Sequence, residues 1–151
     1  RCCWVFCSAS QASLSAIGGS PSPCEAPLLL NVPLLEIYVK DQLYLMQPGF
    51  INAGLGPFYC GDSVSVEGLL GFFPELREKV DVHYIAFPRP RQPLVDALGE
   101  ENQSIPVLIL ADDVGEDSGL HPTRRNGRAF FSDEKAIRSY LSDKFGLPHS
   151  G

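Results

Sequence analysis

The spacing of hydrophobic residues from residue 40 onward alternates between short apolar runs and helical periods. Apolar runs bounded by proline, glycine or charged residues predict four strands, at residues 43–46, 82–87, 105–110 and 128–131. The run at 82–87 is apolar at nearly every position, as in a strand covered on both faces. Pro106 has to stand at the start of the third strand, because inside the ladder it would remove a hydrogen-bond donor. We expect this third strand to be central.

Two longer segments have the period of an amphipathic helix. Asp62 and Ser63 are both good N-cap residues, and the apolar positions after them recur at i, i+3, i+4 and i+7: Val66, Leu69, Leu70 and Phe73. Ser132 or Asp133 caps the second helix, which ends at Gly146 and has one apolar face: Ala136, Ile137, Tyr140 and Leu141. Shorter helices are predicted after Pro74 and at residues 93–98.

The order of these elements limits the topology. The first strand, helix and strand require a parallel pair joined by a right-handed crossover, whereas the last two strands have no helix between them and must be antiparallel. Residues 48–57 hold three glycines and two prolines, and residues 112–127 are polar with three glycines, so both are predicted to be loops. We therefore predict an α/β domain with a four-stranded mixed sheet flanked by helices.

Composition divides the chain near the same point. Residues 1–26 are rich in Ser, Ala, Gly and Pro without a sustained period, so we predict a poorly ordered N-terminal extension at residues 1–39 and one domain at residues 40–149. Residues 34–39 could form an edge strand or pack over the domain. Four cysteines lie in the extension, without the paired spacing of a zinc site, and are interpreted as unstructured thiols: Cys2, Cys3, Cys7 and Cys24.

Charge and hydropathy argue against two classes of partner. The chain has 12 basic and 18 acidic residues, for a net charge of −6, so a nucleic-acid surface is not expected. The apolar run at residues 26–39 contains two prolines, an asparagine and a glutamate, so it is too interrupted to cross a membrane. With only one cysteine after residue 27 the domain has no internal disulfide, which fits a reducing compartment, and we expect a cytoplasmic protein.

Cys60 is the residue around which a chemical function is predicted. It stands between the aromatic residues Phe58 and Tyr59 and the start of the first helix. The unpaired N–H groups and the dipole of a helix N-terminus favour thiolate over thiol, so this position suits a nucleophilic cysteine. The alternative is a partly buried cysteine that packs as a small hydrophobic residue.

The segments LYLMQPGF, FYCGDS, EGLLGFFPEL, DVHYIAFPRPR, IPVLIL and FFSDEKAIRSYL resemble a bacterial family of thioredoxin-like proteins classed as a domain of unknown function. The resemblance covers roughly residues 40–149. It implies a thioredoxin-like fold related to glutaredoxins and to the N-terminal domains of glutathione transferases. Members of the family often carry C-x-x-C, but Ser63 stands where the second cysteine would be. Cys60 therefore cannot close an intramolecular disulfide, and only a monothiol reaction remains.

We expect roles for individual residues from the predicted helix start and, for the cis bond at Pro106, from the resemblance. Cys60 would be the nucleophile, and Ser63 would cap the helix and donate a hydrogen bond to the thiolate. Ile105 and Pro106, joined by a cis bond, would orient a thiol ligand, and Tyr59 would contact that ligand or pack as an aromatic residue. Glutathione or a protein thiol is the expected partner, and no metal ligand set is assigned. The main alternative is a non-catalytic binding module that has kept the scaffold and lost redox activity.

Two features depart from proteins that bind glutathione. The tetrapeptide CGDS resembles the CGFS of monothiol glutaredoxins, which implies glutathione and a shared iron–sulfur cluster, but Asp62 places a negative charge beside Cys60 and opposes thiolate formation. Glutathione transferases have a serine that holds the γ-glutamyl carboxylate at the last helix. Glu134 stands at that position here, and its charge would repel the carboxylate, an effect that Lys135 and Arg138 partly offset.

Overall fold

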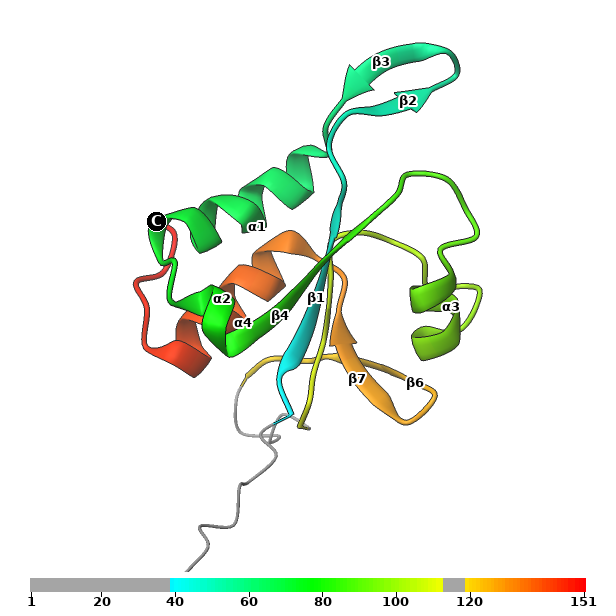
Figure 1. Ribbon diagram of the computed structural model, residues 1–151. Coiled ribbons are helices and arrows are strands. Elements are labelled where there is room, and N and C mark those ends of the chain that lie inside the picture. Colours follow the sequence, from blue (N-terminus) through cyan, green and yellow to red (C-terminus); the bar gives the residue numbers. More distant parts are fainter. Residues whose placement is uncertain (1–38, 113–118) are drawn as a thin grey trace, which may run out of the picture. The chain divides into compact units, whose positions relative to one another are not determined.

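The structure is a computed structural model, and it describes residues 39–112 and 119–151. Residues 1–38 lie outside the described residues, and they include all but the last residue of the predicted extension, its four cysteines and nearly all of the apolar run at residues 26–39. The described part contains a mixed sheet, helices on both of its faces and a separate two-stranded hairpin (Figure 1).

The main sheet has five strands in the order β4-β1-β5-β7-β6. Their bounds are β1 Asp41–Met46, β4 Val80–Ile85, β5 Val107–Ile109, β6 Thr123–Arg125 and β7 Arg128–Phe131. Strands β1 and β4 are parallel, whereas the β1–β5, β5–β7 and β6–β7 pairs are antiparallel. The predicted pairing directions and the central position of β5 are thus confirmed, but the prediction of four strands is wrong. The fifth strand, β6, consists of exposed polar residues and carries no hydrophobic pattern.

The predicted loop at residues 48–57 holds a hairpin. Strands β2 (Phe50–Asn52) and β3 (Leu55–Phe58) pair with each other and extend away from the main sheet (Figure 1). The two residues between them, Ala53 and Gly54, both have positive φ, as a tight two-residue hairpin turn requires. The sequence lacks the usual Asn-Gly signal because alanine takes the first of these positions.

The position of β4 also corrects a prediction. The run at residues 82–87 was expected to be covered on both faces, but β4 ends at Ile85 and forms one edge of the sheet. Three of its six residues are exposed, among them Tyr84. Its other hydrophobic residues pack inward: Val80 is buried, Val82 packs against the cluster that contains Leu43, and Ile85 packs against the cluster that contains Tyr44.

Helices cover the two faces of the sheet in separate hydrophobic clusters. Helices α1 (Gly61–Phe72) and α4 (Glu134–Phe145) pack over one face, where Leu43, Leu45 and Leu108 are buried. Helix α3 (Gln92–Leu98) packs over the other face, against residues such as Tyr44 and Val107. The short helix α2 (Leu76–Lys79) links α1 to β4. Successive strand residues point to opposite faces, so β1 contributes to both clusters.

The predicted ends of α4 are confirmed. Asp133 is its N-cap and accepts a hydrogen bond from the Ala136 N–H at 2.9 Å, and Gly146 ends it in the left-handed conformation. Helix α4 is also joined to the start of β1 by a buried carboxylate. Asp41 accepts hydrogen bonds from Tyr140 Oη at 3.1 Å and Lys144 Nζ at 2.8 Å. These contacts fix the end of the sheet opposite to Cys60.

Candidate functional site

Cys60 lies between β3 and α1, at the end of the sheet where β1 terminates. Its backbone is extended, with φ −87° and ψ 120°, and it is the N-cap residue of α1. Its carbonyl oxygen accepts a hydrogen bond from the Val64 N–H at 3.0 Å, while its side chain makes no hydrogen bond to the helix N–H groups. The thiol is half-buried. The sulfur is therefore placed at a helix N-terminus without being sequestered in the core.

A hollow of about 410 Å³ opens beside this thiol. Tyr59, Cys60 and Ser63, three of the residues predicted for the site, line it together. Tyr59 is 69% exposed and thus free to contact a ligand. The other lining residues come from β1, α1, β4 and the segment after β1: Leu45, Met46, Gln47, Pro48, Val64, Glu67 and Tyr84. Most of this surface is apolar.

Ser63 has a different role in the helix from the one predicted. It was expected to be the N-cap, but the helix starts at Gly61 and Ser63 lies inside its first turn. Its buried Oγ accepts a hydrogen bond from the Met46 N–H at 3.0 Å and so ties α1 to the last residue of β1. A hydroxyl that accepts one bond still has its own hydrogen to donate.

Among the described residues that line this hollow, Glu67 alone is charged, and sequence reasoning did not identify it. Glu67 accepts a hydrogen bond from Tyr84 Oη at 2.8 Å and forms an ion pair with Arg77. Hydrogen bonds with Tyr84 and Glu67 raise the pKa of Arg77. A signal for Glu67 was present, because it follows Ser63 by four residues and thus shares its helical face. The contribution of Tyr84 depends on the pairing of β4 and carries no local signal.

Ile105 and Pro106 precede β5 and are joined by a cis peptide bond, as the resemblance implied. The antiparallel register pairs Tyr44 with Val107, so the chain before β5 runs beside the end of β1. Both residues therefore lie at the same end of the sheet as Cys60. Pro106 is buried, Ile105 packs against the α3 cluster, and neither lines the hollow beside Cys60. Their predicted part in orienting a ligand stays a prediction.

Arg91 is a buried cation at this end of the sheet. Its guanidinium donates to the carbonyl oxygens of Phe87, at 2.8 Å, and Gln103, and its backbone N–H donates to Gln103 Oε1 at 2.8 Å. Burial and then the charge of Arg89 lower the pKa of Arg91, and the charge of Cys60 opposes this effect. Arg91 thus holds together the loops that precede α3 and β5, and it does not line the hollow beside Cys60.

A family model described as a protein of unknown function (DUF3088) matches residues 40–149. The chain belongs to this family. The predicted resemblance to a family of unknown function is thereby confirmed, and the description of DUF3088 names no fold and no activity. No curated protein and no solved structure gives a significant match.

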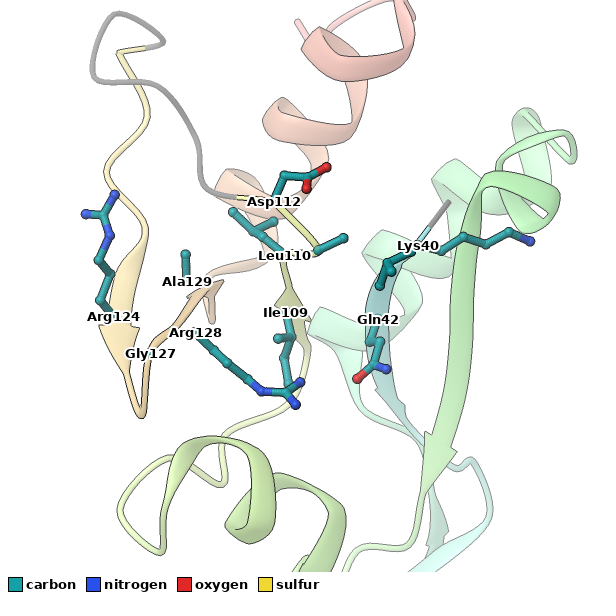
Figure 2. Close-up of a pocket in the computed structure, with 11 residues that line it drawn as sticks. Lys40, Gln42, Ile109, Leu110, Asp112, Arg124, Gly127, Arg128 and Ala129 are labelled. Atoms are coloured by element: carbon teal, nitrogen blue, oxygen red, sulfur yellow. The ribbon is translucent and has the colours of Figure 1, made fainter. Parts of the chain in front are cut away.

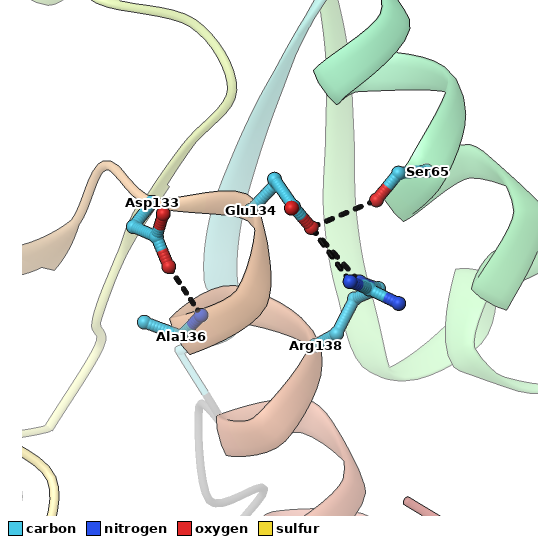
Figure 3. Close-up of polar contacts among 5 residues, drawn as sticks. All are labelled: Ser65, Asp133, Glu134, Ala136 and Arg138. Atoms are coloured by element: carbon cyan, nitrogen blue, oxygen red, sulfur yellow. Dashed lines mark hydrogen bonds and ion pairs between the residues drawn. The ribbon is translucent and has the colours of Figure 1, made fainter. Parts of the chain in front are cut away.

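Glu134 of this DUF3088 domain was expected to repel a glutathione carboxylate, and its charge is in fact paired. Its Oε2 accepts hydrogen bonds from Arg138 and from Ser65 Oγ, the latter at 2.9 Å (Figure 3). Glu134 therefore links α4 to α1. Arg138, which was expected to offset the repulsion, is already bound to Glu134, so neither residue offers a free charge to a ligand.

A second hollow of the DUF3088 domain, of about 380 Å³, lies at the other end of β1. Lys40, Arg124 and Arg128 are among its lining residues. Figure 2 shows the Lys40 and Arg124 side chains on opposite sides of it, with their charged ends pointing away from one another, while Arg128 extends toward Ile109. The cationic groups do not converge on one point, so we assign no anion site there.

No group of three or more His, Cys, Asp and Glu side chains is arranged so that it could hold a metal ion within residues 39–112 and 119–151. Over the same residues, the helices are too short or too polar to traverse a bilayer.

Proposed function

We propose that this DUF3088 domain is a thioredoxin-like protein that performs monothiol exchange through Cys60. The observation that carries the proposal is the half-buried Cys60 thiol at the N-terminus of α1, beside a hollow of about 410 Å³. The strand order β4-β1-β5-β7, with α1 following β1, supports the thioredoxin-like assignment.

The reaction needs one thiolate and one disulfide. The Cys60 thiolate attacks a sulfur of the partner disulfide, a new disulfide forms between Cys60 and that sulfur, and the other partner sulfur leaves as a thiolate. Because Ser63 stands where the second cysteine of C-x-x-C would be, the domain has no second thiol of its own, and a thiol from outside the domain resolves the mixed disulfide. The proposed partner is glutathione or a protein thiol. In this proposal the Ser63 hydroxyl, which accepts a hydrogen bond from the Met46 N–H, donates its own hydrogen toward the thiolate.

The alkylation rate of Cys60 tests the proposal. In the full chain with Cys2, Cys3, Cys7 and Cys24 changed to serine, Cys60 should react with iodoacetamide at pH 7 at least about tenfold faster than free cysteine, because a helix N-terminus favours the thiolate. A Cys60→Ser variant gives the background. A rate equal to or below that of free cysteine would contradict the proposed chemistry.

A non-catalytic binding module is the second candidate function, and the apolar lining of the hollow favours it. A binding module needs the hollow but not a reactive sulfur. The same alkylation experiment separates the two functions, because a slow Cys60 together with a folded domain would favour binding alone. Failure to form a mixed disulfide with oxidised glutathione would remove glutathione as the partner without touching exchange with a protein thiol.

A further inference from the structure

A second hollow adjoins the one beside Cys60. This second hollow, of about 340 Å³, lies between the base of the β2–β3 hairpin and the segment that follows β4. Gln47 and Pro48 line both hollows. The two hollows therefore adjoin at these residues, and we call them together the apolar trough, with Cys60 in one half and Phe50 in the other.

The hairpin supplies one wall of the trough and is fixed in place at its base. The Phe50 ring stacks on Phe87 with centroids 4.5 Å apart and planes 3° from parallel. The Gly49 N–H also donates to the Phe58 carbonyl oxygen at 2.8 Å, which closes the base of the hairpin. Ile51 lines this half of the trough and is 57% exposed, so much of its apolar surface is open to contact.

The charge of the trough argues against an anionic ligand. Among the described residues that line its two halves, Glu67 alone is charged, and it is paired with Arg77. A ligand with carboxylates, such as glutathione, meets no lysine or arginine in this lining. An uncharged apolar ligand meets Pro48, Phe50 and Ile51 and loses no hydration of charged groups.

We propose that the apolar trough binds an extended protein segment whose reacting cysteine lies two residues from a large apolar side chain. This inference rests on the proposed function and names its partner as a protein thiol. In an extended segment, side chains two positions apart point to the same side. The cysteine would thus meet Cys60 while the apolar side chain enters the half of the trough that Phe50 and Ile51 form.

Peptide disulfides with a common leaving group test the partner. The protein is the full chain with its four N-terminal cysteines changed to serine. Three short peptides differ only in the residue two positions from cysteine, which is leucine, glycine or glutamate, and glutathione is the fourth thiol. Each is supplied as its mixed disulfide with thionitrobenzoate. Attack of Cys60 joins its sulfur to the peptide sulfur and releases the coloured thionitrobenzoate thiolate, so the rate is read directly.

The leucine peptide should react about tenfold faster than the glycine peptide, as partial burial of one leucine side chain predicts. The glutamate peptide and glutathione should be no faster than glycine. Ile51→Ser should reduce the leucine advantage at least about threefold, because Ile51 lines the trough. Leu55→Ser is the matched control, since Leu55 is on the same hairpin, is 67% exposed and lines neither half of the trough.

The outcomes separate this inference from the function on which it rests. If no disulfide releases more thionitrobenzoate than the Cys60→Ser variant does, the proposed exchange reaction is wrong. If all disulfides react but leucine has no advantage, or glutathione is fastest, exchange stands and the trough does not select the partner. An equal loss in the Ile51→Ser and Leu55→Ser variants would also overturn the inference.

Discussion

Replacing Ser63 by alanine tests how the candidate site is attached to the sheet. Ser63 and Met46 are both buried, and the hydrogen bond from the Met46 N–H to Ser63 Oγ is 3.0 Å long. Ser63→Ala leaves this N–H without its acceptor, which costs roughly 1–3 kcal/mol for a buried group. Because both residues line the open hollow, water can replace the hydroxyl in part, so we expect a loss of about 1–2 kcal/mol.

Ser65→Ala is the matched control on the same helix. Ser65 Oγ donates to Glu134 at 2.9 Å, but the contact is only partly buried and Glu134 keeps its bonds from Arg138 (Figure 3). We expect a change of at most about 0.5 kcal/mol, as for surface substitutions. Both variants replace serine by alanine within α1, so the gain in helix propensity is similar in each and cancels in the comparison.

Urea unfolding of the variants in the background without N-terminal cysteines gives the difference. The midpoint of the Ser63→Ala variant should fall while its m-value stays constant. Equal stability of the two variants would mean that the Met46 bond contributes nothing and would refute the reasoning. Ser63→Ala should also slow the alkylation of Cys60 at pH 7 under the proposed function, whereas Ser65→Ala should not.

Three further predictions concern the parts of the fold that hold the sheet and α4 in place. Asp41→Asn should lower the free energy of unfolding by about 3 kcal/mol in urea titrations, because it removes the charge paired with Lys144; an unchanged midpoint would contradict this. The pKa of Lys144 is raised by its bonds to Asp41 and Tyr140, against the effect of burial, and burial raises the pKa of Tyr140. Stability should therefore be constant up to about pH 9 and fall above about pH 10, where both groups lose protons in the unfolded chain; equal stability at pH 8 and 11 would be inconsistent with this. Gly146→Ala should cost about 1 kcal/mol, because φ is +65° there, and a neutral or stabilising effect in thermal melts would argue against it.

The sequence predicted best the elements with a strong local signal. Helix α4 combines a capping aspartate, one apolar face and a glycine in the left-handed conformation, and its predicted ends agree with the structure. Strand β7 was predicted with its observed bounds, Arg128–Phe131. Strand β6 was missed because all of its residues, TRR, are polar and exposed. The pairing that makes it a strand comes from β7 and leaves no trace in its own composition.

In the candidate site, too, the residues close to the helix start could be predicted from the sequence, whereas a residue brought in by strand pairing could not. Position next to a helix start identified Cys60, and Tyr59 and Ser63 were found with it. The start of α1 was placed too late because Asp62 and Ser63 are stronger cap residues than cysteine, yet the extended backbone occurs at Cys60. Tyr84 joins the site because β4 lies beside β1, which only the folded sheet reveals.

The β2–β3 hairpin contributes to the apolar surface of the site but not to the position of the Cys60 thiol. Residues 47–59 lie between the end of β1 and Cys60, and the β2–β3 hairpin occupies most of this segment. The position of the thiol depends on the start of α1 and on the hydrogen bond between Met46 and Ser63, and neither includes a hairpin residue. The second half of the apolar trough is formed by Phe50 and Ile51, which are hairpin residues. In the proposed function, α1 therefore determines whether Cys60 reacts, and the hairpin determines which thiol reaches it.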